Sequence, residues 1–161
     1  MEMSMTGHAD TSMNIAFTGS AAAANDTELA EFEQRSGLTL PAAYRDFLTR
    51  HNGGAPSPKR FTTQDGKVES MVAWFFPLAG DGENSLWHEF EGFTLAGQIP
   101  RQILPIARDP ADNRIVLSTT GRDAGHVYYW SWDEEPDPTT CSRRYMRLIA
   151  PDFRAWLNML R

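Results

Sequence analysis

The sequence predicts an α+β fold: a single domain whose mostly antiparallel sheet is flanked by N-terminal and C-terminal helices. Three segments carry apolar residues at the spacing of an amphipathic helix, two near the N-terminus and one at the C-terminus. Between them, short β-prone runs alternate with turns rich in Gly, Asp and Asn, as in sheets built from hairpins. The chain has 161 residues, 41% of them hydrophobic, which suits one globular domain. We expect residues 1–14 to form a flexible N-terminal tail and residues 15–161 to form the domain.

The first helix is expected to begin at Asn25 or Asp26. Either side chain can cap backbone N–H groups, and Glu28 stands where it can complete a capping box. Gly37 ends this helix, because glycine readily adopts the left-handed conformation of a helix exit. Before the helix, residues 15–17 form a short apolar alternation that predicts either an edge strand or a docking segment.

The second helix lies in the most informative stretch of the chain, residues 38–54. Pro41 is expected at its first helical position, where the missing N–H costs no hydrogen bond. The helix ends at Asn52, Gly53 and Gly54, since Asn and Gly tolerate positive φ. One stripe of this helix is expected to be buried, and it contains Tyr44, Phe47, Leu48 and His51.

The middle of the chain predicts the sheet. Residues 55–66 contain two prolines and are interpreted as a loop, whereas residues 68–78 are interpreted as one strand. A short helix is expected within residues 85–93. Further strands are predicted at residues 103–107, 114–118, 126–132 and 145–149, with an acidic loop at residues 133–140. The C-terminal helix begins near Asp152 and buries Phe153, Trp156, Leu157 and Leu160.

Composition and charge restrict the function classes. The net charge of −6 argues against nucleic acid as a direct ligand, because phosphate contacts need clustered Lys and Arg. No apolar run approaches the roughly 18 residues of a membrane span. The N-terminus lacks the basic and apolar regions of a secretory signal, and the single Cys141 excludes an internal disulfide. Together these features indicate a cytoplasmic protein, and the acidic charge permits a basic protein as its partner.

Motifs for catalysis, cofactors or metals are absent from the sequence. There is no nucleophile elbow, no P-loop and no dinucleotide fingerprint. The four His residues include no pair at the helical spacing of a zinc site. Asp109, Asp112 and Asn113 resemble part of a calcium loop but are interpreted as a turn, because the Gly and the closing Glu are missing. We therefore predict no catalytic, cofactor-binding or metal-binding residue.

One region has an unusual charge. No Lys or Arg occurs between Lys67 and Arg101, whereas five acidic and six large aromatic residues do. The aromatic residues 74–76 are assigned to the core on a central strand. The others suit an interface with a basic protein, in which aromatic rings anchor the partner and carboxylates steer its approach. Glu89→Lys is then expected to weaken partner binding and to leave the melting temperature nearly unchanged. With the acidic loop as a second candidate, the predicted protein-binding residues are Asp81, Glu83, Trp87, Glu89, Glu91, Asp133, Glu134, Glu135 and Asp137.

Several short motifs follow one another in a distinctive order. They are Phe32-Glu33, Leu40-Pro41-x-x-Tyr44-x-x-Phe47-Leu48, Asn52-Gly53-Gly54, Phe76-Pro77-Leu78, Leu104-Pro105-Ile106-Ala107-x-Asp109, Gly125-His126-Val127-Tyr128-Tyr129-Trp130 and Phe153-x-x-Trp156-Leu157. This ordered set resembles the SUKH superfamily, also described as the fungal cell-wall-assembly (glucan synthesis) regulator-like domain. The resemblance implies helices packed around a largely antiparallel sheet, and it supplies no catalytic residue. Bacterial members of that family are mostly immunity proteins that bind a cognate toxin, often a nuclease, and block it.

The sequence thus predicts a non-catalytic immunity protein that binds and neutralises a cognate polymorphic toxin. Two alternatives stay open. One is a general protein-interaction scaffold like the fungal regulators. The other is a hydrolase that uses carboxylates of the acidic loop, for which paired carboxylates would have to converge in a cleft.

Overall fold

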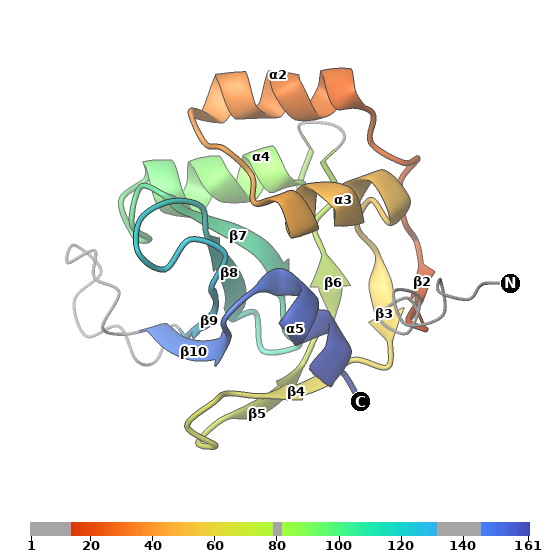
Figure 1. Cartoon of the computed structure of the whole chain (residues 1–161), viewed down its shortest axis with the longest axis vertical. Helices are drawn as coiled ribbons and strands as arrows, with labels where there is room; N and C mark the ends of the chain where they lie inside the picture. The colour runs from red at the N-terminus through yellow and green to blue at the C-terminus, as the bar shows by residue number, and fades with distance from the viewer. Residues whose placement is uncertain (1–13, 79–81, 132–145) are drawn as a thin grey trace, which may run out of the picture.

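The computed structural model describes residues 14–78, 82–131 and 146–161. Figure 1 shows helices gathered at one end of the molecule and a small hairpin at the other, with a sheet between them. In chain order the described elements are β2 (Ala16–Thr18), α2 (Asp26–Ser36), α3 (Ala42–Arg50), β3 (Ala55–Ser57), β4 (Arg60–Thr62), β5 (Glu69–Met71), β6 (Trp74–Phe75), α4 (Leu86–Glu89), the π-helix η2 (Phe90–Leu95), β7 (Ile103–Arg108), β8 (Arg114–Ser118), β9 (Val127–Trp130), β10 (Met146–Ala150) and α5 (Phe153–Met159).

The central sheet has five strands in the order β10-β9-β8-β7-β6. Every neighbouring pair in it is antiparallel, and so are the two smaller sheets, β2–β3 and β4–β5. An antiparallel bridge between Gly54 and Phe75 joins the β3 side of the chain to β6. These pairings confirm the predicted α+β fold with a mostly antiparallel sheet.

Two sequence predictions for the middle of the chain are wrong. Residues 55–66 form β3 and β4 rather than a loop, and residues 68–78 form two strands rather than one. The chain changes its pairing partner between Val72, which donates to Lys59 O at 2.8 Å, and Ala73, which donates to Arg108 O at 2.9 Å. As a result β6 lies at the edge of the central sheet, not at its centre.

The two N-terminal helices form largely as predicted. The capping box of α2 is complete, because Glu28 N donates to Asn25 Oδ1 at 2.9 Å and Asn25 N donates to Glu28 Oε1 at 3.0 Å. Gly37 ends α2 with φ of 78°. Pro41 is the N-cap of α3 rather than its first helical residue, because its ψ of 143° is extended. Its carbonyl still accepts the Arg45 N–H at 2.9 Å, so the prediction is wrong by one position.

Asn52 connects three parts of the chain just after α3. Its side chain is buried, its Nδ2 donates to Ala22 O at 2.8 Å, and its Oδ1 accepts the Leu78 N–H at 2.7 Å. The segment before α2, the end of α3 and the segment after β6 are therefore tied to one amide group. Replacing Asn52 by a residue without an amide would leave the Ala22 carbonyl and the Leu78 N–H without these hydrogen bonds, and unpaired buried polar groups lower the free energy of unfolding.

The two glycines that follow Asn52 allow the backbone to pass through a crowded point. Gly53 and Gly54 have φ of +81° and +111°. A Cβ on Gly53 would lie 2.7 Å from Pro77 N, and a Cβ on Gly54 would lie 2.7 Å from Ser20 Oγ. Gly54 also exchanges two backbone hydrogen bonds with Phe75, at 3.0 and 2.8 Å. Both positions thus need glycine for conformation and for space.

An aromatic cluster joins α3, β6 and α5 in the core. The Phe47 ring lies 4.9 Å from Phe153 and 5.1 Å from Phe75, and Phe75 lies 5.3 Å from Trp156. Such edge-to-face and tilted pairs add to the stabilisation from burial. Tyr44, Phe47 and Leu48 are buried as predicted. His51 is only half-buried: it forms the C-cap of α3 and stacks on Phe17 at 4.4 Å.

Tyr44 provides the first test. Its ring is 1% exposed, and its hydroxyl is buried with no hydrogen-bond partner among the described residues. Burial also raises the pKa of this hydroxyl. We expect Tyr44→Ala to lower the free energy of unfolding by about 3–5 kcal/mol. Tyr44→Phe should leave it unchanged or raise it by about 1 kcal/mol, because it removes a buried unpaired group. Urea denaturation measures both, and a clear loss in Tyr44→Phe would show that the hydroxyl is bonded.

A glycine pair provides the second test. Gly54→Ala introduces both an unfavourable φ and a clash, whereas Gly66→Ala introduces an unfavourable φ of +73° in open space. We expect Gly66→Ala to cost about 1–2 kcal/mol and Gly54→Ala about 1–3 kcal/mol more. Thermal unfolding of the two variants makes the comparison, and equal losses would contradict the crowding at Gly54.

Candidate protein-binding surface

The predicted interface segment folds as α4 followed by the π-helix η2, which confirms the helix expected within residues 85–93. Ser85 caps it, because its hydroxyl accepts the His88 N–H at 3.3 Å and donates to Gly82 O at 2.7 Å. Its core side is formed by Leu86, Phe90 and Thr94, which are buried. The exposed side contains His88, Glu91, Gly92, Leu95 and Ala96.

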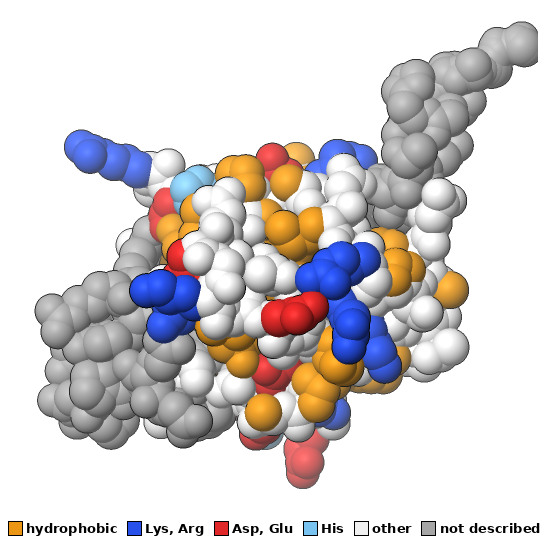
Figure 2. Space-filling model, turned by 90° about the horizontal axis from the view of Figure 1, so that it is seen from below, with side chains coloured by type: hydrophobic (Ala, Val, Ile, Leu, Met, Phe, Trp, Pro, Cys, Tyr) orange, Lys and Arg blue, Asp and Glu red, His pale blue; other side chains and the backbone are white. Residues whose placement is uncertain are grey.

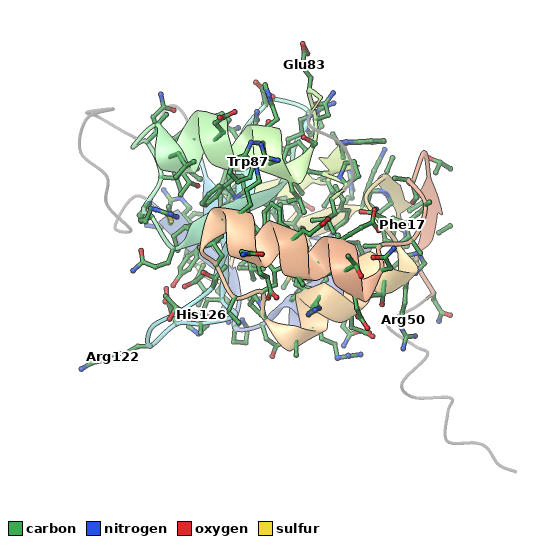
Figure 3. The ribbon with its side chains drawn as sticks, turned by 90° about the horizontal axis from the view of Figure 1, so that it is seen from above. Phe17, Arg50, Glu83, Trp87, Arg122 and His126 are labelled. Carbon is green, nitrogen blue, oxygen red and sulfur yellow. The ribbon has the colours of Figure 1, made fainter. Side chains whose placement is uncertain are left out.

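Trp87 lies between two helices rather than protruding from one. It is half-buried; its ring meets Phe32 of α2 edge to face at 6.4 Å, and the Arg35 guanidinium lies 3.7 Å above it. Figure 3 shows Trp87 beside α2, which runs along α4 in this view. A cation–π contact of this kind stabilises the ring in place. A partner that contacts the Trp87 ring from this side therefore also meets the Arg35 guanidinium that covers it.

Glu89 is a correction to the predicted surface. It is 5% exposed, and its carboxylate forms an ion pair with the guanidinium of Arg114, which is itself 6% exposed. Arg114 also donates to Asp112 O at 2.6 Å and to Asp112 Oδ1 at 2.8 Å, and it lies 4.6 Å from the Phe93 ring. Glu89 therefore attaches α4 to β8 and is not available to a partner. Glu89→Lys would place a second cation beside Arg114, so the structure changes the expectation for this variant from an unchanged to a lower melting temperature.

The other predicted residues divide into two groups. Glu83 and Glu91 are exposed on the loop before α4 and on η2, and Figure 3 shows Glu83 directed away from the helices. The remaining ones lie outside the described residues, and they are Asp81, Asp133, Glu134, Glu135 and Asp137.

The structure adds two features that the sequence reasoning missed. Leu95 is 46% exposed. It is the one large hydrophobic side chain that is classed as exposed among the described residues. It stands four residues after Glu91 on the outer side of η2. Glu31 is exposed on α2, whose Phe32 and Arg35 contact Trp87. The outward position of Glu31 could have been inferred from the buried spacing of Leu29 and Phe32, whereas nothing local marks Leu95 as exposed.

We call the surface formed by Glu31, Arg35, Trp87, Glu91 and Leu95 the α2–α4 face. It combines carboxylates with an exposed aliphatic side chain and a partly accessible indole. This is the composition expected of an interface in which apolar anchors lie inside a charged rim.

The opposite end of the molecule has a different character. Figure 2 shows this end from below, and Lys and Arg side chains lie among acidic ones on it. Its acidic groups are engaged: Arg161 pairs with Glu69 at 2.8 Å and Arg147 with Asp65 at 2.9 Å. The Thr63 hydroxyl, the Lys67 backbone N–H and Arg147 lower the pKa of Asp65 to about 2. Acidic side chains at this end are therefore less available to an incoming basic protein than those of the α2–α4 face.

Asp109 organises a turn, as the sequence interpretation proposed. It is 2% exposed and accepts hydrogen bonds from Tyr129 Oη at 2.6 Å, Ser70 Oγ at 2.9 Å and Asn113 N at 2.8 Å. The charge of this buried carboxylate is stabilised by protein donors. Within residues 14–78, 82–131 and 146–161, no group of three His, Cys, Asp or Glu residues is placed to bind a metal ion. Over the same ranges, no helix has the length and apolar character needed to span a membrane.

Two comparisons with known proteins give matches to this chain. The model of the SMI1 / KNR4 family (SUKH-1) matches residues 23–159, a range that contains every described element from α2 to α5. The SPbeta prophage-derived uncharacterized protein YokK of Bacillus subtilis (strain 168) is 27% identical to this chain over 128 residues. The match covers 68% of this chain and 64% of that relative, so the chain spans less than two thirds of the relative's length.

The buried ion pair provides a third test. Glu89→Ala leaves the Arg114 charge buried with Asp112 alone, and we expect the free energy of unfolding to fall by about 3–5 kcal/mol. Glu91→Ala, on the exposed side of the same helical segment, should change it by no more than about 0.5 kcal/mol. Replacing both partners, in Glu89→Met with Arg114→Met, should recover much of the loss, because apolar pairs often replace buried ion pairs without penalty. Similar losses in Glu89→Ala and Glu91→Ala would contradict the burial of Glu89.

Proposed function

Because the chain belongs to the SMI1 / KNR4 family (SUKH-1), we propose that it is a non-catalytic immunity protein that binds and neutralises a cognate toxin in the cytoplasm. The family assignment over residues 23–159 is the observation that carries this proposal. The absence of catalytic motifs from the sequence and its net charge of −6 support it.

The acidic charge favours a basic partner. A nuclease toxin must itself attract nucleic acid, which requires clustered Lys and Arg around its active site. An acidic protein competes for that surface and is drawn to it by long-range attraction, which accelerates association. Covering the basic site blocks the toxin without any chemistry in the immunity protein.

We propose that the α2–α4 face makes the contact. Glu31, Glu83 and Glu91 are exposed carboxylates that steer the approach. Leu95 is the apolar side chain already accessible to a partner, and Trp87 becomes a second anchor if Arg35 moves to a carboxylate of the toxin. Asp81 and the acidic residues Asp133, Glu134, Glu135 and Asp137 belong to the same proposal, as additional negative charge along the chain.

The proposed function predicts that a toxin domain is encoded next to this chain, and that domain would be the partner used in the test. Co-expression should restore growth of cells that produce the toxin domain, and the two proteins should purify as one complex of defined stoichiometry. Failure to bind or to neutralise that domain, with both proteins folded, would contradict the immunity role. Capture of several unrelated partners without neutralisation would instead favour the general interaction scaffold.

The contact surface is tested by charge reversal. Glu91→Lys should weaken toxin binding about tenfold, mainly by slowing association, and the effect should shrink as salt is raised. Glu69→Lys is the matched control, because it makes the same charge change on β5 at the opposite end of the molecule. Surface plasmon resonance gives both rates, and thermal unfolding confirms that each variant is folded. Equal weakening by the two variants would reject the α2–α4 face as the contact.

A further inference from the structure

A cavity of about 390 Å³ lies where the chain turns from α2 into α3. Its other walls are formed by Arg101 and Gln102, just before β7, and by Thr119 and Thr120, just after β8. Figure 1 shows these three segments on the same side of the molecule. The volume lies within the roughly 300–1,000 Å³ of sites that hold a small molecule. We propose that this cavity binds a small organic anion that carries hydroxyl groups.

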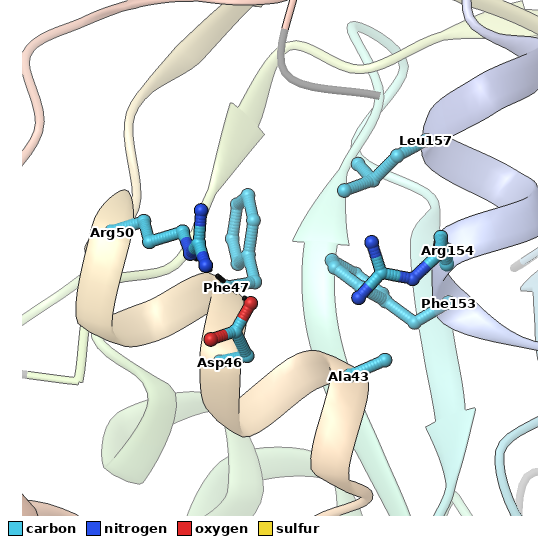
Figure 4. A pocket seen from close by; sticks show the side chains of 7 residues that line it. All are labelled: Ala43, Asp46, Phe47, Arg50, Phe153, Arg154 and Leu157. Carbon is cyan, nitrogen blue, oxygen red and sulfur yellow. Dashed lines mark ion pairs between the residues drawn. The ribbon is translucent and has the colours of Figure 1, made fainter. Parts of the chain in front are cut away.

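The hollow between α3 and α5 is not a comparable site. Its cavity volume is about 20 Å³, which is enough for about one water molecule. Figure 4 shows Phe47, Phe153 and Leu157 among the residues around it, and all three are almost completely buried. The side chains of α3 and α5 therefore fill that space themselves, whereas the cavity beside the α2–α3 connection has room for a ligand.

Three polar side chains on the cavity wall are available to a ligand. Thr39, Gln102 and Thr120 are exposed, and none of these side chains has a hydrogen-bond partner among the described residues. They come from three segments that are distant in the sequence. Together they offer two hydroxyls and one amide, each of which both donates and accepts hydrogen bonds. A ligand with hydroxyl groups can pair with this set, whereas an apolar ligand would displace its water without replacing the hydrogen bonds.

Arg101 supplies the positive charge of the cavity, and its guanidinium is held in place. Its Nη2 donates to Ser36 O at the end of α2 at 3.1 Å, and the guanidinium lies 5.2 Å from the centre of the Phe90 ring. The other N–H groups of Arg101 have no hydrogen-bond partner among the described residues. Because the guanidinium is already oriented, these N–H groups are preorganised for a carboxylate or phosphate oxygen.

Acidic side chains do not compete for this guanidinium. The described residues that line the cavity include one cation and no carboxylate. On the neighbouring segments, Glu33 accepts the Leu40 N–H at 2.7 Å. Asp123 accepts hydrogen bonds from Ser118 Oγ at 2.8 Å and from Tyr128 Oη at 2.6 Å. The cavity is thus locally positive in a chain whose net charge is −6, which favours an anionic ligand.

The cavity does not share residues with the α2–α4 face. None of the residues that define that face lines the cavity. The inference therefore does not rest on the immunity role, and loss of toxin binding would leave it intact.

The ligand class is tested with sodium gluconate as the carboxylate probe and glycerol 3-phosphate as the phosphate probe, both at constant ionic strength. Amide chemical shifts of the full chain should change saturably at Leu38, Gln102 and Thr120, and the probe that binds more tightly identifies the oxyanion. Sorbitol has a hydroxyl in place of the gluconate carboxylate. It should bind about tenfold more weakly or less, because it lacks the charged hydrogen bonds to Arg101.

The location is tested by an isosteric change of charge. Gln102→Glu places a carboxylate on the cavity wall and should weaken binding of the anion by about fivefold or more. Gln64→Glu is the matched control, because it makes the same change at an exposed position in the turn between β4 and β5, at the opposite end of the molecule (Figure 1). Thr120→Val removes one unpaired hydroxyl at constant shape and should weaken binding about two- to fivefold.

The role of the guanidinium is tested by Arg101→Gln, which should weaken binding by about tenfold or more. Arg122→Gln is its control, because Arg122 lies on the loop between β8 and β9 and Figure 3 shows it directed away from the molecule. This variant should leave the affinity unchanged. Thermal unfolding shows whether Arg101→Gln also loosens α2, in which case Gln102→Glu and Thr120→Val decide the outcome.

Three results would overturn the proposal. The first is that neither gluconate nor glycerol 3-phosphate binds. The second is that sorbitol binds as tightly as the anions. The third is that Gln64→Glu weakens binding as much as Gln102→Glu, because the anion would then respond to the charge of the whole chain rather than to this cavity.

Discussion

The two hydrogen bonds of the Asn52 side chain hold together the parts on which both candidate surfaces depend. One bond fixes the segment that leads into α2, and the other fixes Leu78, from which the chain continues towards α4. Asn52 directly follows the C-cap of α3, and Phe47 of that helix contacts α5. The positions of four helices are thus related through one buried amide. Because both the nitrogen and the oxygen of the amide have partners inside the protein, the amide specifies this arrangement as well as stabilising it. Gly53 and Gly54 let β6 approach closely enough to complete the junction.

The parts of the fold that follow from local chemistry were predictable from the sequence. Asn25 and Glu28 mark the start of α2 without reference to any other residue, and Asp152 does the same for α5, where it accepts the Ala155 N–H. The spacing of Phe153, Trp156 and Leu157 identifies the buried side of that helix. The strands from β7 to β10 are bounded by turn residues and filled with β-prone residues, so their existence and antiparallel order were also accessible.

What could not be predicted depends on pairing across long sequence distances. Pro56 indicates a loop, yet β3 tolerates it because β3 pairs with the short strand β2. The division of residues 68–78 follows from a change of partner, from Lys59 to Arg108, that no local pattern reveals. The candidate site shows the same limit. Glu91 was correctly expected on the surface, whereas Glu89 was not expected to meet Arg114, which lies 25 residues later on β8. Two carboxylates that lie two residues apart on one helical segment thus have different roles, one in a buried ion pair and the other on the surface.

The pair formed by Glu89 and Arg114 has a consequence for how related sequences can diverge. Loss of Glu89 leaves Arg114 buried with Asp112 alone, and loss of Arg114 leaves the Glu89 charge buried, whereas joint replacement by apolar residues is expected to cost little. A lineage that abandons the pair must therefore pass through a poorly folded intermediate or acquire both substitutions together. Across the family, the two positions should be inherited as a unit, charged in some branches and apolar in others, while exposed neighbours such as Glu91 vary independently with the partner.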